Sequence, residues 1–159
     1  MKKLLILAVV SMCAFAGWRL LGGGGATSPA QGGDADVLDR VWVDHMPRHE
    51  RDQFSIFVAI TDEPVGVFQT RSVWKGHFEM FRHETYGDEI RILYPQDQHR
   101  EHVKAKARKC SEDGFDYCLE IDGASRGVRR YYSRKGWEVD GAVRPEQLGA
   151  RIEAALAGR

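Results

Sequence analysis

One stretch of the chain has the spacing of a serine nucleophile. The residues 123–127, GASRG, fit the pattern Gly-x-Ser-x-Gly, which in hydrolases holds a serine on a sharp turn between a strand and a helix. Such a serine also needs a histidine later in the chain. Here a strand-like run follows at 128–132, and the last histidine, His102, precedes Ser125. We therefore interpret the stretch as a glycine-rich turn between two strands.

Six histidines raise the question of a metal site. The best-placed set is His77, Glu79 and His83, which share one face of an expected strand. A zinc site needs three or four ligands at about 2.0–2.3 Å from one point. Alternate residues of a strand are already about 7 Å apart, so a solvated strand face explains this set better. We expect no metal, no cofactor and no catalytic residue, and hence a protein that is not an enzyme.

Basic residues are dense on two expected strands in the second half of the chain. If these strands are neighbours, they form a cationic outer stripe suited to anionic lipid or glycan. The alternative is an ordinary solvated face with lysines that protect a strand edge. Acidic and basic residues balance at 23 each, which gives no indication of a nucleic-acid partner. The members of the basic set are Lys104, Lys106, Arg108, Arg129 and Arg130.

Two cysteines are expected to form a disulfide. Cys110 and Cys118 fall on the polar faces of two strands that flank the turn at 111–114. Residues that are opposite or diagonal on one face of a hairpin can reach disulfide distance. The loop that they close is short, so the expected gain in stability is about 2–3 kcal/mol.

The N-terminus is typical of an export signal. Lys2 and Lys3 precede an uncharged apolar run at 4–16. Three outcomes stay open: cleavage after Ala16, lipidation of Cys13, or an uncleaved membrane anchor that extends to about residue 21. All three place the rest of the chain outside the cytoplasm, in the periplasm or cell envelope, because the lysines stay inside. Membrane contact is expected through this segment.

The remaining chain divides into three parts. Residues 22–37 are rich in Gly, Ala, Ser and Pro and predict a flexible linker. Residues 38–137 show apolar residues at every second position in about eight short runs, which predicts antiparallel strands. Residues 138–159 form a tail with a short helix that begins at Pro145. We expect a mainly β domain, either an up-and-down barrel or a sandwich, since periodicity does not separate the two.

Part of this pattern resembles the small lipocalin-like (calycin) barrels. The resemblance rests on the run RVW at 40–42, on regularly spaced hairpins, and on KGHFEM at 75–80 leading to EIRIL at 89–93. It implies that Trp42 lies at the closed end of a barrel, with Arg129, Arg130 or Arg134 packed over it. It also implies an interior that holds an apolar ligand.

The favoured hypothesis is therefore a non-catalytic extracytoplasmic module that binds an apolar or amphipathic small ligand inside the barrel or at its mouth. The alternative is a structural or interaction protein of the envelope that uses its basic outer face and has no internal ligand. The candidate ligand-lining residues are Trp42, Phe54, Ile56, Val58, Trp74, Phe78, Met80, Ile90 and Ile92.

Overall fold

The computed structural model describes residues 36–72 and 75–157. The expected export segment at 1–21, the linker up to residue 35, and Trp74 lie outside this part of the chain. Val37 is already buried, so the folded domain includes it. The elements are β1 (Trp42–Val43), β2 (Phe54–Ala59), β3 (Val65–Arg71), β4 (Gly76–Tyr86), β5 (Glu89–Tyr94), β6 (His99–Glu112), β7 (Phe115–Asp122), β8 (Arg130–Ser133) and α2 (Pro145–Ala157).

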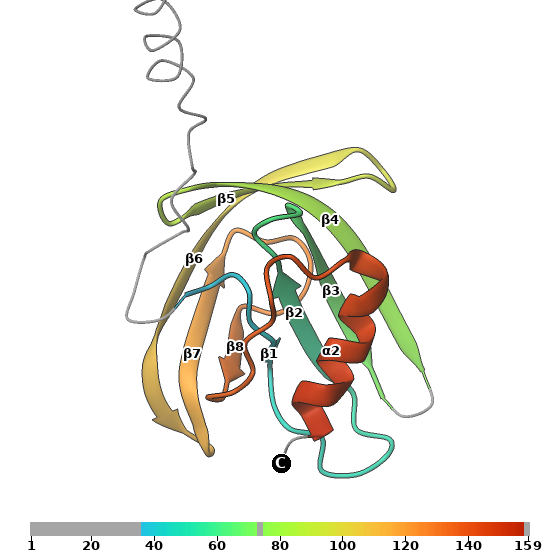
Figure 1. Ribbon diagram of the computed structural model, residues 1–159, viewed down its shortest axis with the longest axis vertical. Helices are drawn as coiled ribbons and strands as arrows, with labels where there is room; N and C mark the ends of the chain where they lie inside the picture. The colour runs from blue at the N-terminus through green and yellow to red at the C-terminus, as the bar shows by residue number, and fades with distance from the viewer. Residues whose placement is uncertain (1–35, 73–74, 158–159) are drawn as a thin grey trace, which may run out of the picture.

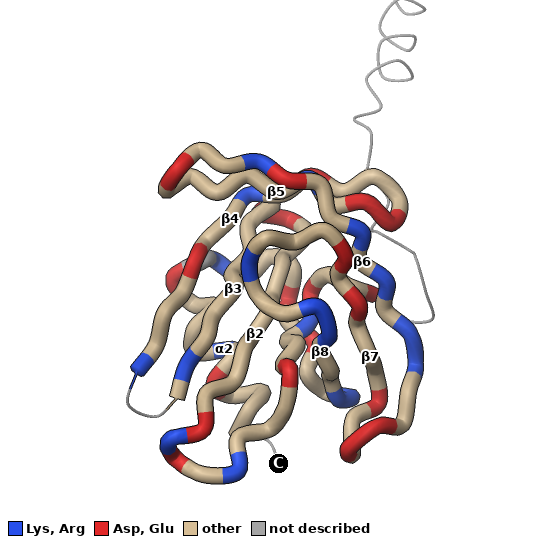
Figure 2. The backbone as a smooth tube through the Cα atoms, turned by 180° about the vertical axis from the view of Figure 1, so that it is seen from behind, with Lys and Arg blue, Asp and Glu red and all other residues tan. Residues whose placement is uncertain are grey.

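The eight strands form one closed antiparallel barrel. Each strand pairs with the next along the chain, and β1 also pairs with β8 (Figure 1). The predicted antiparallel β domain with a short C-terminal helix is thus confirmed, and the closure makes it a barrel rather than a sandwich. Seen from the side opposite α2, charged residues are frequent along β6 and β7 (Figure 2). In the part of the chain described, no helix has the length and apolar content needed to span a membrane.

The hairpin between β6 and β7 forms as the sequence predicts. Asp113 and Gly114 both have positive φ, 49° and 78°, which is the backbone that an Asp-Gly pair favours in a tight hairpin turn. The turn brings Cys110 and Cys118 together on neighbouring strands, and the predicted disulfide joins them with their Cα atoms 5.7 Å apart.

Aromatic rings fill the interior of the barrel. Phe57, Phe68, Phe81 and Tyr131 come from four different strands, and their ring centroids lie between 5.1 and 6.1 Å apart. Trp42 is fully buried beside them, and its indole nitrogen donates a hydrogen bond of 2.9 Å to the carbonyl oxygen of Val37. These contacts join the N-terminal end of the domain to the interior.

A second core lies outside the barrel, beneath the C-terminal helix. α2 runs across the outer wall formed by β2 and β3 (Figure 1). Its apolar residues Leu148, Ile152 and Leu156 are buried in one cluster with the outward side chains of β1 and β2. Arg71 of β3 and Glu153 of α2 are joined by an ion pair at the edge of this cluster. The expected tail is therefore packed on the domain.

The inner and outer faces predicted for β2 are wrong. Phe54, Ile56 and Val58 belong to the cluster beneath α2, whereas Phe57 and Ala59 point into the barrel. All six residues of β2 are buried because the helix covers one face and the barrel encloses the other. A strand that is apolar on both faces does not reveal which face is the inner one.

The faces predicted for β4 are also wrong. Phe81 belongs to the interior cluster, while Phe78 and Met80 lie on the outer face. The inner face of β4 carries the polar residues Glu79 and His83. Both are accommodated there, because Glu79 pairs with Arg126 and the His83 Nε2 lies 3.0 Å from the carbonyl oxygen of Ile60.

Candidate ligand-binding surface

The candidate ligand-lining residues separate into three environments. Trp42, Ile90 and Ile92 lie in the interior cluster of the barrel, as expected. The three candidates from β2 lie beneath α2. Phe78 and Met80 stay exposed, at 63% and 41% of their surface. The structure therefore does not gather the predicted set around one cavity.

Close packing leaves little room beside the interior rings. A Cβ atom added at Gly66 would overlap the Phe81 ring and lie only 2.7 Å from the carbonyl oxygen of Val58. At Gly127 an added Cβ would overlap the Tyr131 hydroxyl and lie 2.6 Å from the Phe68 ring. Glycine is needed at both positions because ring atoms occupy the space of a side chain.

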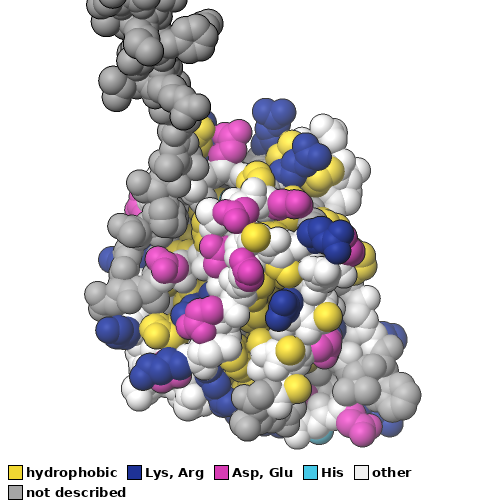
Figure 3. Space-filling view, viewed as in Figure 1, with side chains coloured by type: hydrophobic (Ala, Val, Ile, Leu, Met, Phe, Trp, Pro, Cys, Tyr) yellow, Lys and Arg dark blue, Asp and Glu magenta, His cyan; other side chains and the backbone are white. Residues whose placement is uncertain are grey.

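Space for a ligand is found instead on the outer wall. A groove of about 310 Å³ runs between α2 and the outward faces of β3 and β4. Figure 3 looks at this side of the molecule, where hydrophobic side chains reach the surface beside the helix. Gly149 of α2 faces open space, and because it has no side chain it leaves this part of the groove open. The lining residues are Val65, Gly66, Val67, Gln69, Phe78, Met80, Glu146, Leu148, Gly149 and Ile152.

The groove has the composition of a small-molecule site. Its volume is at the lower end of the range of about 300–1,000 Å³ that such sites occupy. Phe78 and Met80 are two of the three large hydrophobic residues that are exposed in the described part of the chain, with Tyr86 as the third. Aromatic and thioether side chains adapt to many apolar partners. The sequence named these two residues as ligand-lining candidates on the inner face, whereas the structure places them on the outer face.

The GASRG stretch lies in the connection between β7 and β8, as the sequence predicts. Arg126 of this loop lies over the Tyr94 ring, with 3.8 Å between the guanidinium carbon and the ring centroid. Its guanidinium also pairs with Glu79 and Asp97. The backbone nitrogen of Ser125 donates a hydrogen bond of 2.9 Å to Glu101. The loop therefore covers one end of the interior through Arg126.

Burial and hydrogen bonds shift the pKa values of two groups under this loop in opposite directions. The Tyr94 hydroxyl is buried and donates a hydrogen bond of 2.5 Å to Glu101. Burial and this hydrogen bond raise the pKa of the hydroxyl well above its usual value. Burial opposes ionisation of Glu101, but hydrogen bonds from Ser125 and Tyr94 outweigh it and lower the pKa of this carboxyl. A neutral phenol that donates to a charged carboxylate makes a strong hydrogen bond. This arrangement closes the end of the barrel.

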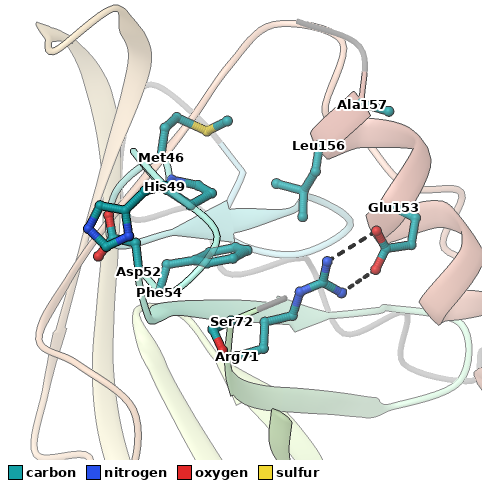
Figure 4. Close-up of a pocket in the computed structure, with 10 residues that line it drawn as sticks. Met46, His49, Asp52, Phe54, Arg71, Ser72, Glu153, Leu156 and Ala157 are labelled. Carbon is teal, nitrogen blue, oxygen red and sulfur yellow. Dashed lines mark hydrogen bonds and ion pairs between the residues drawn. The ribbon is translucent and has the colours of Figure 1, made fainter. Parts of the chain in front are cut away.

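A second hollow lies where α2 ends against the barrel (Figure 4). It holds about 240 Å³ and is lined in part by His49, Asp52 and Ser72. Asp52 accepts a hydrogen bond from the backbone nitrogen of Arg48, which is the main reason that the pKa of its carboxyl is lowered. The dashed contacts in Figure 4 join Arg71 to Glu153. These contacts fix the loop and the helix in place.

The histidines considered for a metal site do not converge. His77 is exposed and lies 3.3 Å from Glu79, whereas His83 is buried in the barrel. Across residues 36–72 and 75–157, the group of potential ligand atoms that do come together is Cys110, Glu112 and Cys118. Its two sulfur atoms are joined in the disulfide.

The basic residues predicted as a stripe are separated by acidic ones. β7 lies between β6 and β8, so the two basic strands are not neighbours. Arg129 pairs with Asp122 at 2.7 Å and Arg130 with Glu120 at 3.0 Å. Lys104 and Lys106 lie opposite these same two carboxylates in the β6–β7 register, and Arg108 is 3.7 Å from Glu112. Figure 2 shows this alternation of charge. The expected cationic stripe is therefore not continuous.

A different group of basic residues, which sequence reasoning missed, lies on the outer faces of β4, β5 and β6. Arg82 is paired in register with Leu93, and Leu93 with Arg100. The two arginines and the leucine between them line a concavity of about 440 Å³. The two hairpin turns near residues 87 and 96 could have indicated this row, because a turn position determines which residues of its two strands face each other.

The arginine expected over Trp42 is found elsewhere. Arg134 lies over the rings of Phe115 and Trp137, at 5.2 and 5.8 Å from their centroids. Arg129 and Arg130 pair with carboxylates on the outer wall.

Comparisons with protein-family models, with curated proteins and with solved structures find no significant match to this chain.

Proposed function

We propose that this protein is a non-catalytic binding module, which takes an apolar or amphipathic small ligand in the groove between α2 and β4. The observation that carries the proposal is the exposure of Phe78 and Met80 along an apolar groove of about 310 Å³. Large apolar side chains beside a concave surface lose their contact with water when a ligand covers them. The groove supports ligand binding better than the interior does, because aromatic rings occupy the interior.

The proposed setting is extracytoplasmic. The support is the pattern at the N-terminus, with Lys2 and Lys3 before an apolar run, together with the disulfide between Cys110 and Cys118. Disulfides form and persist in oxidising compartments such as the periplasm. The module would act there either released or attached to the membrane by its N-terminal segment.

Binding of N-phenyl-1-naphthylamine, a neutral dye that fluoresces in apolar surroundings, tests the proposal. The double variant F78S/M80S should raise the Kd of the dye at least tenfold, because it removes the apolar wall of the groove. The matched control is Tyr86→Ser, which removes an exposed aromatic side chain from the same face of β4 outside the groove. Equal affinity of wild type and F78S/M80S would contradict the proposal.

A further inference from the structure

The apolar groove and a cationic concavity lie next to each other along one strand. Phe78, Met80 and Arg82 are alternate residues of β4 and share its outer face. Successive members of such a row are about 7 Å apart. Phe78 and Met80 line the groove beside α2, and Arg82 lines the concavity over β4, β5 and β6. One extended molecule can therefore contact both.

Two arginines flank an apolar floor in this concavity. Arg82 and Arg100 lie on either side of Leu93, separated by two strand spacings or about 10 Å of backbone. Both are exposed. Their long side chains can converge above Leu93, and the planar guanidinium group matches the oxygen atoms of a carboxylate, sulfate or phosphate.

These two arginines differ from most others because they have no carboxylate partner among the described residues. Nearby, Arg91 lies over the Tyr86 ring at 4.4 Å and is 3.9 Å from Glu89. Glu84, which lines the same concavity, accepts a hydrogen bond of 3.1 Å from the Tyr86 hydroxyl. The arginines of this chain that do have a carboxylate partner include Arg40, Arg71, Arg108, Arg126, Arg129, Arg130 and Arg144.

We propose that the ligand is a single-chain amphiphile with an anionic head group. Its head group binds between Arg82 and Arg100, and its chain lies in the groove against Phe78 and Met80. The inference rests on the proposed function, because it uses the same groove. The concave groove of about 310 Å³ suits one free chain better than a flat bilayer surface. In Figure 3, Lys and Arg side chains lie beside hydrophobic ones above the beginning of α2.

Competition against bound N-phenyl-1-naphthylamine tests this inference on the full chain. The competitors are dodecanoate and dodecanol, which share a chain length and differ in charge, both used below the concentration at which they aggregate. Wild type should prefer dodecanoate at least tenfold at low salt, and the preference should shrink as salt screens the charges. The variant R82Q/R100Q should lose this preference and keep its affinity for dodecanol.

The matched control is K104Q/K106Q, which removes the same number of charges from the outer face of β6. It should leave the preference for dodecanoate within twofold of wild type. An equal preference for dodecanoate over dodecanol in wild type and R82Q/R100Q would overturn the inference. Binding to vesicles of phosphatidylcholine and phosphatidylglycerol, but not to free dodecanoate, would overturn it as well. If dye binding depends on Phe78 but neither competitor displaces the dye, the groove remains and the inference fails. Dye binding that is independent of Phe78 would instead overturn the proposed function.

Discussion

The barrel interior and the groove beside α2 are both apolar, yet they differ in the space that they leave. Each contains a glycine that shows the difference. An added Cβ at Gly66 overlaps the Phe81 ring inside the barrel, whereas one at Gly149 meets no atom within 4 Å. The interior is therefore closely packed, whereas the groove leaves open space at the surface. Substitutions on the two sides should give opposite results.

The largest effect is expected in the interior. Gly66→Ala should lower the free energy of unfolding by about 3 kcal/mol, because neither the Phe81 ring nor the backbone of Val58 can move away easily. Urea denaturation monitored by circular dichroism measures the change. A variant as stable as wild type would show that the interior has spare room, and the comparison with the groove would then fail.

The disulfide should affect stability without affecting binding. Replacing both Cys110 and Cys118 by serine should lower the free energy of unfolding by about 2 kcal/mol, because the bond closes a short loop in the unfolded chain. The bond lies on the β6–β7 hairpin, away from the residues that line the groove, so the dye should bind with unchanged Kd. A tenfold loss of dye affinity would show that the groove depends on this hairpin.

A smaller, pH-dependent effect is expected from His83. Burial lowers the pKa of this imidazole from 6.5, and its Nδ1 has no hydrogen-bond partner in the described residues. The unfolded chain therefore takes up a proton more readily than the folded one as the pH falls. The contribution of neutral His83 to the free energy of unfolding should be fully present above pH 6.5. It should decrease as the pH falls toward 5, by at most about 1.4 kcal/mol per pH unit.

The control for this effect is His83→Gln, whose side-chain amide can still donate a hydrogen bond to the carbonyl oxygen of Ile60. Urea midpoints at pH 7, 6 and 5 should change less in this variant than in wild type. The carboxyls with lowered pKa, such as Glu101 and Glu138, start from 4.5 and lose their contribution only at lower pH. Identical profiles for wild type and variant would show that another group causes the loss.

Sequence reasoning predicted local pairing better than the faces of strands. The hairpin at Asp113-Gly114 and its disulfide depend on residues close in the chain, and both were predictable. The faces of β2 depend on α2, which lies some 90 residues later and buries Phe54 from outside. The inner face of β4 was not recognised because it carries the charged residue Glu79. The partner that makes this charge acceptable there, Arg126, comes from a distant loop. Apolar alternation alone does not contain this information.

The environment of the basic residues also depends on distant parts of the chain. Arg129 and Arg130 stood out in the sequence because they are adjacent, but carboxylates of β7 compensate them. Arg82 and Arg100 are isolated in the sequence, and the register of β4, β5 and β6 brings them to either side of Leu93. A charged surface is therefore determined by strand order and register more than by local density.

The smallest change in stability is expected in the groove. Gly149→Leu should raise the free energy of unfolding by about 1 kcal/mol, because glycine is a poor helix former and leucine a good one. The added side chain should at the same time occupy the open space beside Phe78 and abolish dye binding. Gly149→Ala is the control, since it gains the same helix propensity but adds only one carbon atom to the groove. Stabilisation with full dye affinity in Gly149→Leu would mean that the dye binds elsewhere, because a filled groove cannot also hold a ligand.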